Sequence, residues 1–177
     1  MKLVVFGASS SKNSINQQLA IFAANQFDGF EIEILDLNDF EVLIYSIDRE
    51  QENGIPQKIK NFISTIESAD LLIISLAEHN GSYSTAFKNI FDWASRAKSK
   101  TFESNKMFLL ATSPGARGGL SVLETAKNRF PYHGAEILGT FSLPNFTTNF
   151  DKKTGIIDSI LKESFKTTVN EIKMNLK

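Results

Sequence analysis

The sequence has no cysteine among its 177 residues. This absence excludes disulfides, thiolate nucleophiles and cysteine–zinc sites, and it fits a reducing compartment. The formal net charge is −1, so no excess of positive charge would attract nucleic acid or an acidic membrane. Uninterrupted apolar runs, such as residues 71–74 and 107–111, fall far below the roughly 18 residues of a membrane span. Residues 3–6 are also too few for the core of a signal peptide. We therefore expect a cytoplasmic protein that binds neither nucleic acid nor membranes.

Two familiar phosphate-binding patterns are absent as well. The chain has no Gly-x-x-x-x-Gly-Lys-Ser/Thr, which argues against a nucleoside-triphosphate loop. It has no Gly-x-Gly-x-x-Gly, so the usual dinucleotide fingerprint is missing too. What it has instead is a hydroxyl-rich stretch at residues 7–16, which suits a phosphate monoester.

This stretch lies between a predicted strand and a predicted helix. Residues 3–6 are apolar, as in a buried parallel strand, and apolar residues recur at helical spacing from Ile15 onward. The backbone N–H groups of such a loop and of the first helical turn have no partners, and the helix dipole favours an anion there. Four serines add hydroxyl donors and Lys12 adds charge. The stretch therefore predicts a phosphate site, and the alternative is that Ser14 only caps the helix.

The rest of the chain alternates strands with helices. Further strands are expected at 30–36, 71–76, 106–112 and 137–143, and residues 37–54 form a long connection. Helices are expected after Pro56, over 84–97, from Leu120, and over 156–176. The pattern predicts one α/β domain over 1–177, a flavodoxin-like doubly wound sandwich with a five-stranded parallel sheet of order 2-1-3-4-5. Loops 7–16, 77–83 and 113–119 would then meet at one sheet edge, where such folds bind ligands.

At these loops the chain resembles the NADPH-dependent FMN reductase family, and the resemblance covers nearly the whole chain. The family's first loop reads Gly-Ser-x-Arg-x-x-Ser-x-Asn, and residues 8–16 match it at Ser9, Ser14 and Asn16. Ala8 stands where the family has Gly, and Ser11 where it has Arg. The residues of this loop that the resemblance implies at the cofactor are Ser9, Ser11, Lys12, Ser14, Ile15 and Asn16.

Two later segments carry the rest of the resemblance. Residues 77–92 match the family's Pro-Glu-Tyr-Asn-Gly-Ser-Tyr-Pro…Leu-Lys-Asn-x-x-Asp, with Ala77 and Ser84 in place of the prolines and His79 in place of the first Tyr. This match implies that the flavin ring is bordered by Glu78, His79, Asn80, Gly81, Ser82 and Tyr83. The Gly-rich loop at 113–119 corresponds to the one that covers the ring's pyrimidine side, which implies contacts from Ser113, Pro114, Gly115, Arg117, Gly118 and Gly119.

The resemblance implies an oxidoreductase that uses FMN and NADPH or NADH. Hydride would pass from NAD(P)H to bound FMN and on to a second acceptor by a ping-pong mechanism. The acceptor could be free flavin, a quinone, an azo compound or a metal oxyanion, and the family forms homodimers or homotetramers. Hydride transfer is the cofactor's chemistry, so no acid–base residue is assigned. Glycines in the second and third loops would let the backbone approach a flat ring closely.

Two alternatives stay open at this point. A flavodoxin-like electron carrier would bind FMN tightly without oxidising NADPH, although the charge of −1 and the serine-rich loop argue against it. A non-enzymatic relic, suggested by the departures at Ala8, Ser11, Ala77 and His79, would stay colourless when FMN is added.

Several single residues have simpler interpretations. Arg117 either binds the 2′-phosphate of NADPH or is a solvated loop residue. His79 is either a site residue or an exposed loop histidine, and His133 is expected in a surface turn. Trp93 is expected in the core or a subunit interface, where apolar residues of helix 84–97 could also contribute. We expect Asn89 and Asp92 to hold the start of that helix and its loop.

Overall fold

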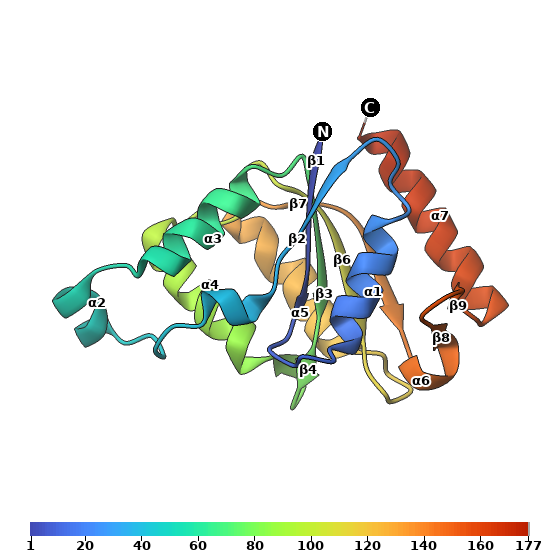
Figure 1. Ribbon diagram of the computed structural model, residues 1–177, viewed down its shortest axis with the longest axis horizontal. Coiled ribbons are helices and arrows are strands. Elements are labelled where there is room, and N and C mark those ends of the chain that lie inside the picture. Colours follow the sequence, from blue (N-terminus) through green and yellow to red (C-terminus); the bar gives the residue numbers. More distant parts are fainter. Residues whose placement is uncertain (177) are drawn as a thin grey trace.

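The computed structural model describes residues 1–176 and contains one five-stranded parallel sheet. Its strand order is β2-β1-β3-β6-β7, which confirms the predicted 2-1-3-4-5 order (Figure 1). The strands are β1 (Lys2–Ala8), β2 (Glu31–Ile34), β3 (Leu71–Leu76), β6 (Lys106–Thr112) and β7 (Glu136–Leu143). Every residue of β3 is buried, which explains why this strand reads as an unbroken apolar run.

Helices cover both faces of the sheet. Helices α1 (Ile15–Ala24) and α7 (Ser159–Asn175) pack on one face, and α3 (Gln57–Glu67), α4 (Thr85–Ala97) and α5 (Leu120–Arg129) pack on the other (Figure 1). Side chains of β1 alternate between the two cores, with Val4 and Phe6 in one and Leu3 and Val5 in the other. Over residues 1–176, no helix has the length and apolar character needed to cross a membrane.

The structure adds short elements that the sequence pattern did not predict. Two are antiparallel hairpins, β4 (Glu78–His79) with β5 (Ser82–Tyr83), and β8 (Phe150–Asp151) with β9 (Gly155–Ile156). The connection after β2 contains the 3-10 helix η1 (Leu37–Phe40) and α2 (Ile47–Asn53), which projects from the body of the molecule (Figure 1). Helix α6 (Phe146–Asn149) follows β7, and the 3-10 helix η2 (Phe130–His133) follows α5.

One expectation about the helices is corrected and another is confirmed. The last helix begins at Ser159 rather than at 156, because Asp158 caps it by accepting a hydrogen bond from the Leu161 N–H, while Ile156 belongs to β9. Of the two positions expected for the apolar residues of α4, the core or a subunit interface, the structure supports the core, where Phe87, Ile90, Phe91, Trp93 and Ala94 are all buried. The expectation of a core position for Trp93 is thus confirmed.

Asn89 has a different role from the predicted one. Its Oδ1 accepts a hydrogen bond from the Tyr45 N–H at 2.9 Å, and its Nδ2 donates to the Val42 carbonyl at 3.1 Å. Trp93 Nε1 donates to the Leu43 carbonyl at 2.8 Å. These bonds hold residues 42–45 against α4 rather than fixing the helix start. Asp92 forms an ion pair with Lys88 on the same helix instead.

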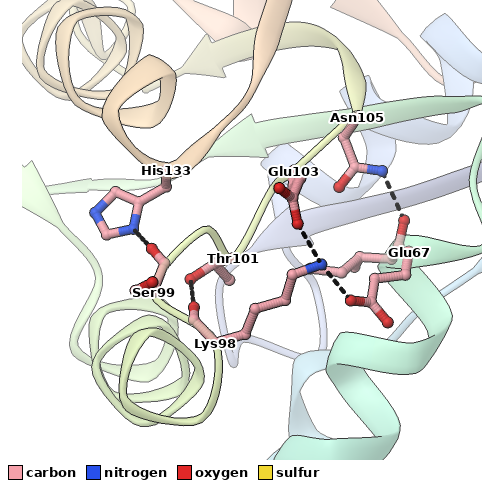
Figure 2. A network of polar contacts seen from close by, with 8 residues as sticks. Glu67, Lys98, Ser99, Thr101, Glu103, Asn105 and His133 are labelled. Atoms are coloured by element: carbon pink, nitrogen blue, oxygen red, sulfur yellow. Dashed lines mark hydrogen bonds and ion pairs between the residues drawn. The ribbon is translucent and has the colours of Figure 1, made fainter.

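A polar network at the amino ends of the strands fixes the loop between α4 and β6 (Figure 2). Lys98 Nζ lies 2.5 Å from Glu67 and 3.4 Å from Glu103, and Asn105 Nδ2 donates to the Ile66 carbonyl at 2.8 Å. His133 belongs to this network and is 8% exposed, so the expectation of a residue in a surface turn was wrong, and it is the last residue of the 3-10 helix η2. Its Nδ1 lies 2.9 Å from the Ser99 carbonyl, and its ring packs on Phe91.

This burial predicts a stability difference in mild acid. Desolvation lowers the pKa of His133, and the hydrogen bond to the Ser99 carbonyl opposes it only partly. Below a pH of about 6.5 the histidine takes up a proton in the unfolded chain, whereas in the folded chain it stays neutral down to a lower pH. Protonation therefore favours the unfolded chain, and the free energy of unfolding falls as the pH falls. A His133→Gln variant should lose less stability than the wild type between pH 7 and pH 5, measured as urea midpoints. Parallel pH profiles for the two proteins would contradict this.

Candidate functional site

The first loop, residues 9–14, joins β1 to α1 at the carboxyl edge of the sheet. Ser14 caps α1, since its Oγ accepts a hydrogen bond from the Gln17 N–H at 3.1 Å. Gly7 lets the strand and helix lie close together, because a Cβ there would sit 2.4 Å from the Gln17 nitrogen. The Gly7 N–H in turn donates to Gln17 Oε1. Gly7 and Gln17 position the loop, and sequence reasoning missed both.

The loop presents unpaired backbone donors. Among the described residues, the N–H groups of five residues find no acceptor, namely Ser10, Lys12, Asn13, Ile15 and Asn16. Ser9 Oγ accepts from the Ser11 N–H at 3.2 Å, and Ser14 Oγ serves the cap, so both hydroxyls keep a proton to donate. Lys12 and Ser11 are exposed. Unpaired amides, hydroxyls and one ammonium at a helix start form a site for an anion. The capping interpretation of Ser14 is confirmed, and it leaves the phosphate prediction intact.

Asn16 joins this loop to two neighbouring strands. Its Oδ1 accepts from Ser75 Oγ at 2.8 Å and from the Thr112 N–H at 3.1 Å, and its Nδ2 donates to the Thr112 carbonyl at 3.2 Å. Ser75 and Thr112 lie near the carboxyl ends of β3 and β6, and all three residues are buried. The Asn16 side chain therefore positions the edge, and its backbone N–H is left without an acceptor among the described residues.

The second loop is the β4–β5 hairpin. Asn80 and Gly81 form its turn with φ of 51° and 76°, a left-handed pair that Asn-Gly adopts readily. Residues 79–82 are exposed. Both ends of the hairpin are fixed by side chains. Glu78 Oε2 accepts from the Val122 N–H at 3.0 Å, and Ser84 Oγ donates to the Ala8 carbonyl at 2.7 Å.

Tyr83 packs inward beneath this hairpin. Its ring lies 5.5 Å from that of Phe87 and is stacked with that of Phe130 at 6.1 Å. Burial raises the pKa of Tyr83 to about 12, so its hydroxyl stays neutral at physiological pH. Within residues 1–176 this hydroxyl is buried without a hydrogen-bond partner. The ring supports the hairpin from the core side.

The third loop, residues 113–119, combines an exposed part with a buried part. Ser113 is half-buried, and residues 114–117 are exposed, with Arg117 Nη2 donating to Ser121 Oγ at 3.0 Å. Gly118 and Gly119 are buried with φ of 58° and 74°. A Cβ at Gly118 would lie 2.5 Å from Ser142 Oγ and 2.8 Å from the Pro144 nitrogen, so a larger residue has no room.

A fourth segment, residues 142–146 at the end of β7, supports the third loop. The sequence analysis did not include it in the site. Ser142 Oγ donates to the Gly118 carbonyl at 3.0 Å, and the Asn145 N–H donates to the Gly115 carbonyl at 3.0 Å. The Phe146 N–H reaches the Ser113 carbonyl at 3.1 Å. The Pro144-Asn145 pair, typical of a turn, was the available signal.

The three predicted loops thus meet at one edge, and bonds between loops connect them. Two cavities flank the first loop. One of about 430 Å³ is bounded by Ser10, residues 37–44 and the start of α4, and one of about 370 Å³ runs along the outer side of α1. Sequence reasoning had not included residues 37–44 in the site. The donors are hydroxyls and amides, with cations at Lys12 and Arg117, a set suited to binding an anionic, planar ligand rather than to proton transfer.

Comparisons with known proteins agree with this arrangement. The chain is 27% identical over 150 residues to an NADPH:quinone oxidoreductase of Arabidopsis thaliana, covering 78% of this chain and 70% of that one. It is 28% identical over 162 residues to an uncharacterised protein of Mycoplasma pneumoniae, covering 89% and 95%. The fold matches that of the flavoenzyme NAD(P)H:(acceptor) oxidoreductase FerB of Paracoccus denitrificans with a TM-score of 0.72, at 22% identity, over 98% and 97% of the two chains.

The family model for NADPH-dependent FMN reductases matches residues 1–148. This range includes all three loops and extends through the supporting segment 142–146. With most of the chain matched, the protein belongs to the NADPH-dependent FMN reductase family.

Proposed function

We propose that the chain binds FMN at the carboxyl edge of the sheet and uses NADPH or NADH to reduce it. The observation that carries this proposal is the first loop, where five unpaired N–H groups and two serine hydroxyls surround the start of α1 beside Lys12. An FMN phosphate supplies the acceptors that these donors lack. Lys12 contributes the one side-chain cation of the loop, in which Ser11 replaces the family's arginine.

The other loops would hold the flavin ring. In this arrangement the exposed turn residues 79–82 border one edge of the ring, and residues 113–119 lie along its pyrimidine side. The side chains of Glu78 and Asn16 would position neighbouring segments rather than contact the ring. Glu78 accepts a hydrogen bond from the Val122 N–H, and the Asn16 side chain is bonded to Ser75 and Thr112. Tyr83 supports the hairpin from below. Gly118 and Gly119 let the third loop fold tightly onto residues 142–144.

The bound flavin would accept hydride from NAD(P)H and pass electrons to a second acceptor. The protein's part is to fix the phosphate, present N–H groups where the reduced ring carries negative charge, and leave one ring face open. The exposure of residues 79–82 and 114–117 leaves space above the site. NAD(P)H and acceptor would then occupy the same face in turn, which is a ping-pong mechanism. A quinone is the acceptor we favour, because the Arabidopsis relative is named for that activity.

We also propose that the chain forms a homo-oligomer. Leu43, Ile44 and Ile47 are 73%, 67% and 48% exposed on the projecting segment before and within α2. Bonds from Asn89 and Trp93 hold this segment in place, so its apolar side chains are presented rigidly. Light scattering after size exclusion measures the mass directly, and a monomer at micromolar concentration would contradict this.

One experiment tests the flavin proposal. The protein as purified, or after addition of FMN, should be yellow, and NADPH under anaerobic conditions should bleach it. Adding a soluble quinone should restore the colour and sustain NADPH oxidation. A protein that remains colourless with excess FMN would refute the proposal, whereas tight FMN binding without NADPH oxidation would favour an electron carrier.

A further inference from the structure

The cavity of about 370 Å³ on the outer side of α1 has no role in holding the flavin ring. It begins at the first loop, at Lys12 and Ser14, and continues along the helix to Asn25. The 11 residue steps from Ser14 to Asn25 correspond to roughly 16 Å of helix. The β8–β9 hairpin forms the opposite wall through Phe150 and Lys152. The groove therefore leads away from the proposed phosphate site along one helix face.

The entrance of this groove is positively charged. Lys12 and Lys152 both line it, and none of its lining residues is acidic. The neighbouring acid, Asp151, is engaged in its own turn, where its Oδ1 accepts from the Lys153 N–H, the Thr154 N–H and Thr154 Oγ1. This turn fixes the backbone on both sides of Lys152. Within residues 1–176 neither lysine forms an ion pair, and two such cations favour an anion beyond the one proposed at the first loop.

The middle of the groove is apolar and rigid. Phe22 packs edge-on against Phe150 at 5.5 Å and lies 5.4 Å from Phe165. A Cβ at Gly155 would lie 2.1 Å from the Phe22 ring, so the hairpin backbone rests directly on that ring. An aromatic floor held on several sides suits a flat apolar group.

Amide side chains lie along the same groove. Gln18 and Asn25 both line it. Gln18 Nε2 donates weakly to the Ser14 carbonyl at 3.4 Å, and its Oε1 is buried without a partner among residues 1–176. Amide side chains can both donate to and accept from the polar edge of a heterocycle.

We infer that this groove is a subsite for an adenosine 5′-phosphate group belonging to a dinucleotide. The lysines at the entrance would hold a phosphate, and the adenine would lie near Phe22 between Gln18 and Asn25. This inference rests on the proposed flavin site, which fixes the entrance of the groove next to the FMN phosphate. Two dinucleotides carry such a group. In FAD it extends from the flavin phosphate itself, and in NADPH it belongs to the reductant.

The test compares charge reversals at two adjacent residues of one turn. Lys152→Glu changes the groove, and Lys153→Glu makes the same change of charge at a residue that does not line it. Dissociation constants for FMN and FAD are measured by quenching of flavin fluorescence, and KM values are measured for NADPH. We expect Lys152→Glu to weaken FAD binding, or to raise the KM for NADPH, by about tenfold while FMN affinity changes less than about twofold. Lys153→Glu should change each value less than about twofold.

The measurements with FAD and with NADPH show which dinucleotide supplies the adenosine group. A selective loss of FAD affinity assigns the groove to the flavin dinucleotide, and a selective rise in the KM for NADPH assigns it to the reductant. Equal effects of the two substitutions, or a loss of FMN affinity as large as the other losses, would overturn the inference. Failure of wild-type protein to bind FMN at all would instead count against the proposed function. The groove can be tested even if the protein does not bind FMN. Flavin-free protein is titrated with ADP, and the NMR shifts of Gln18 and Lys152 are followed. The absence of shifts at both residues would overturn the inference.

Discussion

Ser14→Asp is expected to abolish FMN binding while leaving the fold intact. Aspartate is as good a helix cap as serine, so its carboxylate would still accept the Gln17 N–H. The same carboxylate would place negative charge where the phosphate is proposed to bind, within a buried position that screens little. We expect FMN affinity to fall at least about 100-fold, or roughly 2.7 kcal/mol, in a fluorescence titration.

The matched control is Ser14→Asn. Asparagine has nearly the shape of aspartate and also caps helices well, but it carries no charge. Its FMN affinity should fall far less than that of Ser14→Asp, and both variants should unfold at urea concentrations close to that of the wild type. Similar losses of affinity in the two variants would mean that steric exclusion, not charge, governs the site. Unchanged affinity in Ser14→Asp would remove the phosphate assignment.

Asn16→Ala is expected to be the most destabilising substitution at this edge of the sheet. It removes three hydrogen bonds and leaves the N–H and carbonyl of Thr112 buried without their partner. Each unsatisfied buried group costs about 1–3 kcal/mol, so the free energy of unfolding should fall by about 3–4 kcal/mol. Urea denaturation followed by fluorescence of Trp93, the single tryptophan, measures this.

Asn13→Ala provides the comparison in the same loop. Asn13 is exposed, and its side chain forms no hydrogen bond within the described part of the chain. Its removal should change stability by less than about 0.5 kcal/mol. A small effect for Asn16→Ala as well would show that water replaces the lost bonds, and that Asn16 is not the link between the first loop and strands β3 and β6.

The sequence allowed the main sheet to be predicted because each buried strand is a short apolar run between polar loops. The strands at residues 71–76 and 106–112 could therefore be predicted without knowing which segments pack against them. The short hairpins were harder. Strands of two residues, such as Phe150–Asp151, have too little periodicity to detect, and Gly155 lies in its strand because Phe22 leaves room for nothing larger. His133 is buried by its contacts with Phe91 and Ser99, which no local pattern reveals.

For the candidate site, the sequence predicted which loops meet but not how each residue is used. Loop position follows from parallel topology, so residues 9–16, 78–83 and 113–119 could be placed at one edge. Side-chain direction depends on packing between distant segments. Asn16 faces Ser75 and Thr112, and Glu78 faces Val122, through contacts that span between 44 and 96 positions in the sequence. Neither contact could be predicted from spacing.

The hydrogen bonds between Ser84 and Ala8 and between Val122 and Glu78 have a consequence for engineering. Each loop at this edge is completed by atoms from another, so the loops are not interchangeable modules. A graft that imports the hairpin of a relative without its partner positions would lose the helix cap at α5 and the anchor on β1 together. Recombination between relatives should therefore succeed when the crossover lies outside residues 8–146, and fail when it separates partners within this range.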